Sequence, residues 1–339
     1  MAPGLSVRIR GGGIAASCCE TLLAQAQVDY QREPAPRPKV PAVMLSPATQ
    51  SLLTDVFARP DLFDGLHPIR RRLVTWGSSD LVALPHAAVV VSEEELLNRL
   101  AAAAPATGSS PASPSLESAP TWTIHASGAT AGASALREFG ARQASAAQVK
   151  LTAQADVYSC SMEAVPNGWL FLVPSSTETA WLLAAGDTSE ALLAQSRQIS
   201  QQIDRVTSGG GSFPAQPRIA ESLCEPGRLA CGSAAIAFDP LCGDGTGHAV
   251  REAILACAIA RASQQEALDD LLWEYRLRLW SGFKRHLELC HEFYATGGTS
   301  DWWKAQRAAI EDGLRWMTAQ QAPVTLGRYR LNGFSLERT

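Results

Sequence analysis

Apolar and polar residues alternate at the start of the chain, and a helical pattern follows a run of glycines. Residues 5–9 alternate as a short strand, residues 11–13 form a glycine turn, and residues 14–27 are rich in helix formers. Residues 28–30 are predicted to form the next strand, which closes at Glu33 before a proline-rich exit. The order of strand, glycine turn, helix and strand predicts the first half of a βαβ unit.

Helices and strands are mixed in the next part of the chain. Ser46 is a typical N-cap for a helix over residues 46–57, with Pro47 at its first helical position. A second helix is expected from residue 92 to about 104, because acidic residues fill its first turn. Extended stretches are expected at residues 72–76, 81–84 and 87–91. The Ala/Ser/Pro-rich segment 105–120 is typical of a surface loop.

Strands dominate the region between about residues 122 and 187. We expect them at residues 122–126, 146–151, 168–173 and 180–185. Their branched and aromatic content favours an antiparallel sheet that walls a pocket.

A second glycine-rich loop occurs late in the chain. Residues 229–232 are predicted to form a strand, the loop covers residues 239–247, and a helix is expected from 248 to 262. From residue 264 to about 321 the sequence is predicted to be helical. Its apolar residues recur at three- and four-residue steps, as in Leu268, Leu271, Leu272, Tyr275, Leu279, Phe283 and Leu287. Such a stripe is typical of core packing.

Composition places the chain among globular proteins. Its 339 residues, 46% hydrophobic and 18% charged, suffice for one large mixed domain or two smaller domains that share a cleft. The net charge of −4 favours neither nucleic acid nor an anionic membrane as a partner. None of the eight cysteines forms a C-x-x-C pair, so no metal site is predicted. We find no signal peptide and no apolar run near the ~20 residues of a membrane helix, and we expect a cytoplasmic protein.

The N-terminal glycines match a dinucleotide-binding turn. Gly11, Gly13 and Ala16 form a G-x-G-x-x-A pattern between strand and helix. Gly11 permits the tight bend, Gly13 lets the backbone approach a pyrophosphate, and Ala16 lets the helix pack on the strand. Glu33 lies about 20 residues further on, where an acidic residue would accept hydrogen bonds from the ribose. The predicted contacts to the nucleotide are Gly11, Gly12, Gly13, Ile14, Ala15, Ala16 and Glu33.

The late loop carries a more specific signal. Residues 228–250 resemble the flavin motif of the FAD-dependent monooxygenases related to p-hydroxybenzoate hydroxylase, in particular the branch of tryptophan halogenases and geranylgeranyl reductases. The matching residues are Gly232, Asp239, Pro240, Gly243, Gly245 and Gly247. Residues 124–128 resemble that family's D-A-T-G strand, and residues 168–174 resemble its strand on the substrate side of the flavin. The matches occur in family order over about residues 5–290.

The resemblance implies an α/β fold with a Rossmann-type FAD-binding domain, an antiparallel-sheet substrate domain and C-terminal helices. The expected bounds are 1–40, 85–140 and 225–265 for the FAD-binding domain, 41–84 and 141–224 for the substrate-side sheet, and 266–339 for the helical region. Further FAD contacts are expected from Gly232, Ser233, Asp239, Pro240, Gly243, Asp244 and Gly245. The substrate pocket is expected to be lined by Trp169, Phe171 and Pro174.

Three departures from the family pattern lower the expected affinity for FAD. Ser233 replaces the aspartate of a Gly-Asp pair, so a charge-assisted bond to the ribityl chain becomes a weaker neutral one. His125 replaces the D-A-T-G aspartate, and the stretch 95–122 is too short for the extra strands beside the cofactor. Halogenases of this branch use a lysine near the substrate and a W-x-W-x-I-P segment. Here one tryptophan and the proline remain and no lysine matches, so halogenation is not expected.

Three polar residues are candidates for catalysis: Asp244, His248 and His86. Asp244 lies in the loop expected beside the flavin, where it would be a general base or a solvent-facing turn residue. His248 is expected near the start of the following helix, whose dipole disfavours a positive charge and favours a neutral ring. His86 would face the flavin pocket or have a structural role.

The leading hypothesis is an FAD-dependent oxidoreductase of the monooxygenase type that acts on an organic or peptidyl substrate. FAD is the expected cofactor, with NAD(P)H or another reductant as electron donor. Two alternatives stay open. One is a flavoprotein maturation factor that modifies a partner protein during assembly of a peptide-derived quinone cofactor. The other is a degenerate, non-catalytic flavin-fold binding protein, for which Ser233 and His125 are the reasons.

Overall fold

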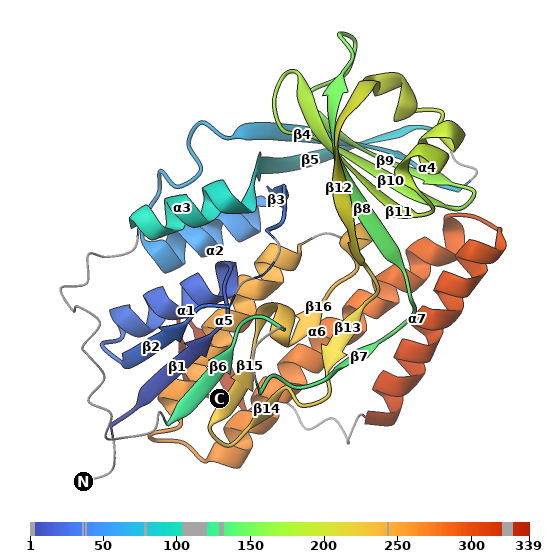
Figure 1. The fold of residues 1–339 in the computed structure, drawn as a ribbon. Helices are drawn as coiled ribbons and strands as arrows, with labels where there is room; N and C mark the ends of the chain where they lie inside the picture. The colour runs from blue at the N-terminus through green and yellow to red at the C-terminus, as the bar shows by residue number, and fades with distance from the viewer. Residues whose placement is uncertain are drawn as a thin grey trace.

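Two large sheets and a pair of long C-terminal helices organise the molecule (Figure 1). The computed structural model describes residues 4–35, 37, 39–77, 80–103, 121–128, 132–242, 244–320 and 328–339. The loop predicted at residues 105–120 lies outside the described residues. Within these ranges, no helix combines the length and the apolar character needed to cross a membrane.

The smaller of the two large sheets contains the predicted βαβ unit. Its strand order is β14-β15-β6-β1-β2, and all neighbours are parallel except β14 and β15. The strands are β1 (Ser6–Arg10), β2 (Asp29–Glu33), β6 (Trp122–His125), β14 (Cys224–Glu225) and β15 (Arg228–Ala230). Val7 and Ile9 of β1 are buried while Arg8 and Arg10 are half-buried, because successive side chains of a strand point to opposite faces.

Four helices pack around one another beside this sheet. They are α1 (Ile14–Gln25), α2 (Pro47–Phe57), α3 (Glu93–Ala103) and α5 (Gly245–Ala262). The predicted cap of α2 is confirmed, since Ser46 Oγ accepts a hydrogen bond from Thr49 N at 3.3 Å and Pro47 begins the helix. α2 lies against α1 and α5, although residues 41–84 were expected in the substrate-side sheet.

The larger sheet has eight strands in the order β12-β8-β11-β10-β9-β4-β5-β3. They are β3 (Val43–Leu45), β4 (His67–Thr75), β5 (Val82–Val91), β8 (Gln143–Leu151), β9 (Ser159–Val165), β10 (Gly168–Pro174), β11 (Thr179–Gly186) and β12 (Ile203–Pro214). All neighbours are antiparallel except β4 and β9. The stretches expected at 81–84 and 87–91 form one strand, β5, so the expected boundary at residue 85 falls inside a strand. β4 also begins earlier than the stretch expected at 72–76.

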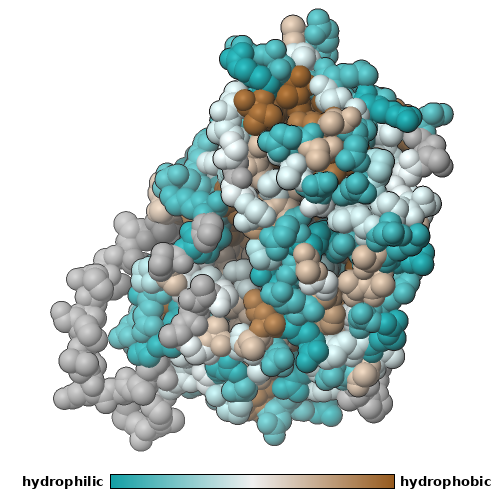
Figure 2. Space-filling view, turned by 45° about the vertical axis from the view of Figure 1, so that its right-hand side comes forward, coloured by the Kyte–Doolittle hydropathy of each residue, from teal (hydrophilic) through white to brown (hydrophobic). Residues whose placement is uncertain are grey.

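The two faces of the larger sheet are covered differently. On one face Leu170, Leu172 and Leu182 belong to a separate apolar cluster beside α4 (Ser189–Gln195). On the other face Trp169 and Phe171 join the main core, which reaches both sheets and the C-terminal helices. A small third sheet contains β7 (Leu136–Glu138), β13 (Arg218–Ala220) and β16 (Ile236–Ala237). Figure 2 shows that the outer surface on one side is mostly hydrophilic, with hydrophobic side chains gathered in compact areas.

The C-terminal part consists of two long helices and a short hairpin. α6 (Leu268–Thr296) and α7 (Asp301–Gln320) pack against each other, and the stripe on α6 faces the core as predicted, with Leu271 and Phe283 fully buried. The last described residues are not helical, because β17 (Tyr329–Asn332) and β18 (Ser335–Arg338) form an antiparallel hairpin. Its two-residue turn begins at Gly333, which has a φ of 55°. The helical region expected over 266–339 therefore ends before this hairpin.

Candidate functional site

The turn between β1 and α1 leaves the N-terminus of α1 without a side-chain cap. Gly11 and Gly13 have φ angles of 118° and 86°, which favour glycine. A Cβ atom at Gly11 would lie 2.8 Å from the backbone nitrogen of Ser127, just beyond β6. Gly13 is the N-cap of α1 and makes no side-chain cap hydrogen bond, while Ile14 and Ala16 are buried. A buried helix start without a side-chain cap leaves backbone N–H donors that an anion could satisfy.

Arg37 adds a positive charge directly over this turn. A Cβ atom at Gly13 would collide with the Arg37 guanidinium, so the two groups are in close contact. Arg37 forms an ion pair with the buried carboxylate of Glu93, which also accepts a hydrogen bond from Val40 N at 2.7 Å. Burial lowers the pKa of Arg37 from its ordinary value. The helix N-terminus and this fixed guanidinium together suit a phosphate group.

Glu33 ends β2 at the same edge of the sheet. Its two carboxylate oxygens lie 2.9 Å from Arg8 Nε and 2.7 Å from Arg10 Nε. A carboxylate has about four acceptor positions, so Glu33 keeps the capacity to bind a ribose hydroxyl. His125 ends β6 close by, and burial, followed by the charges of Arg10 and Arg228, lowers its pKa. The ring is therefore uncharged at neutral pH and does not reproduce the charge of an aspartate.

The late glycine motif meets the N-terminal turn. A Cβ atom at Gly232 would lie 2.9 Å from Ala15 Cβ, and Gly232 N donates a hydrogen bond of 2.7 Å to Glu252 Oε2 on α5. Burial raises the pKa of Glu252 to about 8. Ser233 is exposed next to this contact. The two motifs predicted from the sequence are therefore brought together, whereas Gly243 lies outside the described residues.

Asp239 begins the late loop and is completely buried. Its carboxylate forms an ion pair with Arg142, accepts a hydrogen bond from Tyr294 Oη at 2.9 Å, and accepts another from Leu241 N at 2.9 Å. Its backbone nitrogen donates to His286 Nε2 at 2.8 Å. Because both Tyr294 and His286 belong to α6, this helix fixes the start of the loop. Asp239 is thus an anchor of the loop.

The three residues expected to line the substrate pocket lie on one strand, β10. Trp169 is fully buried, and its Nε1 donates to Tyr294 Oη at 3.0 Å, so it extends the Asp239 cluster. Phe171 is half-buried on the same face of the sheet. Pro174 is buried at the end of the strand, and alternation places it on the opposite face. The structure therefore brings Trp169 and Phe171 together but separates them from Pro174.

Asp244 is held by two side-chain hydrogen bonds at the start of α5. It is the N-cap residue with a φ of 113°, and its carboxylate accepts hydrogen bonds of 2.7 Å each from Thr49 Oγ1 and Arg251 Nη2. Both partners hold the charged carboxylate, which favours a structural role over that of a general base. Pro240 is half-buried and Gly245 is exposed in the same loop.

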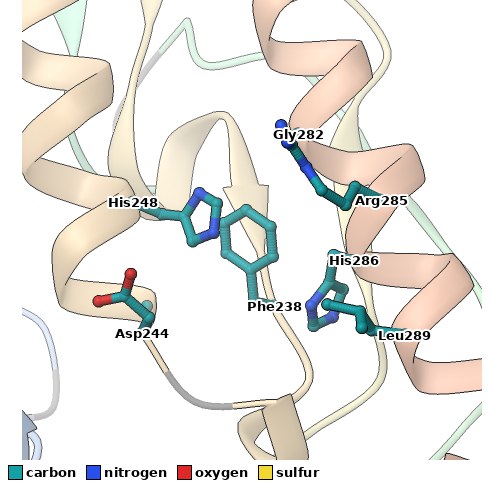
Figure 3. A pocket seen from close by; sticks show the side chains of 8 residues that line it. Phe238, Asp244, His248, Gly282, Arg285, His286 and Leu289 are labelled. Atoms are coloured by element: carbon teal, nitrogen blue, oxygen red, sulfur yellow. The ribbon is translucent and has the colours of Figure 1, made fainter. Parts of the chain in front are cut away.

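A pocket of about 190 Å³ lies between this loop and α6 (Figure 3). Its lining residues are Phe238, Asp244, Gly245 and His248 from the loop and α5, and Gly282, Arg285, His286 and Leu289 from α6. The His248 ring stacks on Phe238 with ring centroids 4.0 Å apart. Burial, followed by the charge of Arg251, lowers the pKa of His248 to about 4. The ring is uncharged at neutral pH, the state expected from the sequence.

His86 lies apart from this pocket, on β5. Its Nε2 is 3.3 Å from Arg72 Nη2, and burial, followed by the charge of Arg72, lowers its pKa. A neutral His86 ring can accept a hydrogen bond from Arg72, which gives this histidine a structural role.

The sequence interpretation missed Arg37, Arg142 and Tyr294. Arg37 lies within the proline-rich segment after Glu33, and the restricted backbone of such a segment was the available signal. Arg142 and Tyr294 carried no local signal, because their partner Asp239 is distant in sequence and their role depends on tertiary packing.

Comparisons with known proteins identify the fold. No protein-family model matches the chain, and no curated protein matches it in sequence. Among solved structures, the flavin-dependent halogenase CmlS has a TM-score of 0.73 at 17% identity, over 93% of this chain and 70% of that one. The peptidyl tryptophan dihydroxylase QhpG, essential for tryptophylquinone cofactor biogenesis, has a TM-score of 0.70 at 14% identity, over 99% and 86%. A variant of HpxO from Klebsiella pneumoniae, complexed with FAD, has a TM-score of 0.62 at 14% identity, over 93% of each chain.

These similarities cover nearly the whole chain, at identities that establish the fold alone. The resemblance inferred from the two glycine motifs is confirmed at that level, as are the parallel sheet, the mostly antiparallel sheet and the C-terminal helices. The chain has the fold of the flavin-dependent halogenases and FAD-dependent monooxygenases.

Proposed function

We propose that this chain binds FAD and is an oxidoreductase of the monooxygenase type, acting on an organic or peptidyl substrate. The observation that carries the proposal is the uncapped N-terminus of α1 with the Arg37 guanidinium held over Gly13. In a fold shared with FAD-dependent enzymes, this arrangement suits the pyrophosphate of FAD.

The residues fit FAD along the edge of the smaller sheet. The α1 N-terminus and Arg37 would hold the pyrophosphate, Glu33 would accept from the ribose, and Ser233 and the loop that begins at Asp239 would lie at the flavin end. Bound FAD would supply the redox chemistry, with electrons from NAD(P)H or another reductant and with oxygen as the oxidant. The chain itself would orient the substrate and exclude water.

The lysines argue against halogenation as the activity of this chain. Lys39, Lys284 and Lys304 form ion pairs with glutamate or aspartate on the surface, and Lys150 lies on β8. None of these four lysines, which are all that the sequence contains, lines the pocket of Figure 3. Oxygen transfer from a flavin enzyme does not depend on such a lysine, so monooxygenation is the activity proposed.

A peptidyl substrate has a specific argument in its favour. QhpG, which is a peptidyl tryptophan dihydroxylase, matches 99% of this chain, and that coverage includes α6, the C-terminal helix that lines the pocket. A role as a maturation factor for a partner protein is therefore the more specific form of the proposal. A non-catalytic role is the competing function, since Ser233 and the uncharged His125 each replace an aspartate of the family motif.

The test is an FAD titration followed by absorbance and fluorescence, with Arg37→Gln as the variant and Arg59→Gln as the control. Arg59 pairs with Asp61 on the surface, whereas Arg37 contacts the glycine turn. Loss of one charge-assisted contact is worth ~1.5–3 kcal/mol, so Arg37→Gln should weaken FAD binding by about 10- to 100-fold and Arg59→Gln should not.

A second measurement separates catalysis from binding alone. The FAD-loaded protein is mixed with NAD(P)H without oxygen, and bleaching of the flavin absorbance is expected. Binding of FAD without reduction by any of several physiological donors, while dithionite as the positive control does bleach the flavin, would favour the non-catalytic function. A colourless protein that takes up no added FAD contradicts the whole proposal.

A further inference from the structure

The pocket beside the late loop continues along α6 as an exposed apolar strip. Leu289 lines the pocket, and Phe293 lies one helical turn further on; these side chains are 44% and 40% exposed although both are large and apolar. Trp76, just after β4, packs edge-on against Phe293 with ring centroids 6.0 Å apart and donates a hydrogen bond from Nε1 to Phe293 O at 2.9 Å. The strip thus runs from the pocket to the end of β4.

The pocket and the strip together extend along about three turns of α6. From Gly282 to Phe293 the helix advances by about 16 Å, at 1.5 Å per residue. A pocket of about 190 Å³ takes one side chain and leaves Phe293 and Trp76 uncovered. About five residues of extended polypeptide, at roughly 3.3 Å each, would cover the same distance.

The chemistry of the pocket selects the residue that enters it. Phe238 and the uncharged His248 stack, and His286 meets Phe238 edge-on at 4.8 Å, so the wall is aromatic. His286 Nε2 accepts from Asp239 N, so the proton of the neutral ring lies on Nδ1 as a donor. In the described ranges no carboxylate pairs with Arg285, which leaves a cation at the rim. An aromatic ring with a nearby carboxylate complements these groups.

We propose that the α6 groove, formed by Phe238, His248, Arg285, His286, Leu289 and Phe293, binds an extended segment of a partner polypeptide. One aromatic side chain enters the pocket, an acidic side chain meets Arg285, and apolar side chains cover the strip. The inference rests on the proposed function for its purpose, since it names polypeptide as the substrate class, but the binding itself is independent of FAD.

Binding in the groove is coupled to the late loop by short contacts. A ring in the pocket touches Phe238, the residue before Asp239, and His286, the acceptor for Asp239 N. When FAD is bound, an occupied groove is therefore expected to shift the visible absorbance of the flavin.

The first test selects binders from a displayed library of random heptapeptides on the immobilised protein. The Leu289→Asp/Phe293→Asp double variant, checked for folding by circular dichroism, serves for counter-selection. We expect enrichment of peptides in which an aromatic residue lies within three positions of an acidic one. No enrichment over the double variant would overturn the proposal.

Calorimetry with the best peptide then tests each group. Burying two apolar anchors predicts at least about tenfold weaker binding to the double variant. Arg285→Glu should weaken binding of the acidic peptide but not of its amide analogue. Val206→Asp, on β12, is the matched control, because Val206 is also an exposed apolar residue at 42% and should leave the affinity unchanged.

Three outcomes would overturn the inference. N-acetyltryptophanamide binding as tightly as the peptide would identify a small-molecule pocket. Self-association that the double variant abolishes in sedimentation would identify a second copy of this chain. Peptides that bind the double variant as well as the wild type would place the contact elsewhere. Each measurement is made with and without FAD, so that failed FAD binding with intact peptide binding refutes only the proposed function.

Discussion

Asp239→Asn removes the negative charge from an ion pair that is closed off from solvent. The side chains of Asp239 and Arg142 are both 0% exposed. Asparagine has nearly the same shape and keeps an oxygen that can accept from Leu241 N, so the main change is an unpaired guanidinium in the interior. Removing one partner of a buried pair costs ~3–5 kcal/mol, because the remaining charge is left without compensation.

The expected shift in melting temperature follows from chain length. At ~2.1 cal/mol/K per residue, the entropy of unfolding is about 0.7 kcal/mol/K for 339 residues, so Tm should fall by about 4–7 °C. Urea unfolding followed by circular dichroism gives the free energy directly, provided that the transition is two-state.

Two controls make the experiment decisive. Asp301→Asn breaks a surface pair with Lys304 in which Asp301 is 99% exposed, and stability should not change measurably. The double variant Arg142→Met/Asp239→Leu removes both charges and should recover much of the loss. If Asp239→Asn costs less than about 1 kcal/mol, the claim that this pair anchors the late loop is refuted.

Three further changes are expected to have distinct signatures in urea titrations. Glu252→Gln keeps an acceptor for Gly232 N but removes a carboxyl group with a pKa of about 8 against an ordinary 4.5. The folded wild type keeps that proton up to a higher pH than the unfolded chain does, so the wild type loses stability as pH rises from 4.5 to 8. The variant should match the wild type near pH 4 and exceed its stability at pH 8 by about 4 kcal/mol, since each pKa unit between 4.5 and about 8 is worth about 1.36 kcal/mol. The free energy of unfolding of His248→Gln should rise by ~1–2 kcal/mol relative to the wild type as pH falls from 6.5 to 4, because histidine takes up its proton at a higher pH in the unfolded chain than in the folded one. A difference between the two proteins that does not change with pH would contradict this. Glu163→Gln should cost ~2–3 kcal/mol and speed amide exchange over residues 197–199, whose backbone nitrogens donate to that carboxylate; unchanged exchange would count against it.

The sequence predicted correctly those elements that depend on interactions between neighbouring residues. The cap at Ser46 and the glycine turn at residues 11–13 depend on neighbouring backbone groups, and both are present. β5 was split in two because Pro85 interrupts its pattern; the structure accommodates the proline where β5 has only one neighbouring strand, since β3 pairs only with residues 89–91. The C-terminal hairpin was missed because it is short and follows a long helical pattern.

Only the part of the candidate site that depends on local sequence motifs could be predicted. Gly13 and Gly232 belong to motifs that are visible in the sequence. Arg37 is held in position by an ion pair with Glu93 of α3, which the sequence does not reveal. Arg142 and its partner Asp239 are far apart along the chain. Ion pairs between residues so far apart in sequence produce no periodic pattern of the kind that identifies helices and strands.

The two glycine motifs, which meet where Gly232 contacts Ala15, are made at different times. Gly11 leaves the ribosome about 220 residues before Gly232, a delay of roughly 10–45 s at 5–20 residues per second. During that interval β1 lacks its parallel neighbour β6 at first, and the sheet lacks β15 until near the end. The nascent chain therefore presents the β1–α1 turn with open strand edges, and Gly232 reaches its place against Ala15 only after roughly two-thirds of the chain has been made.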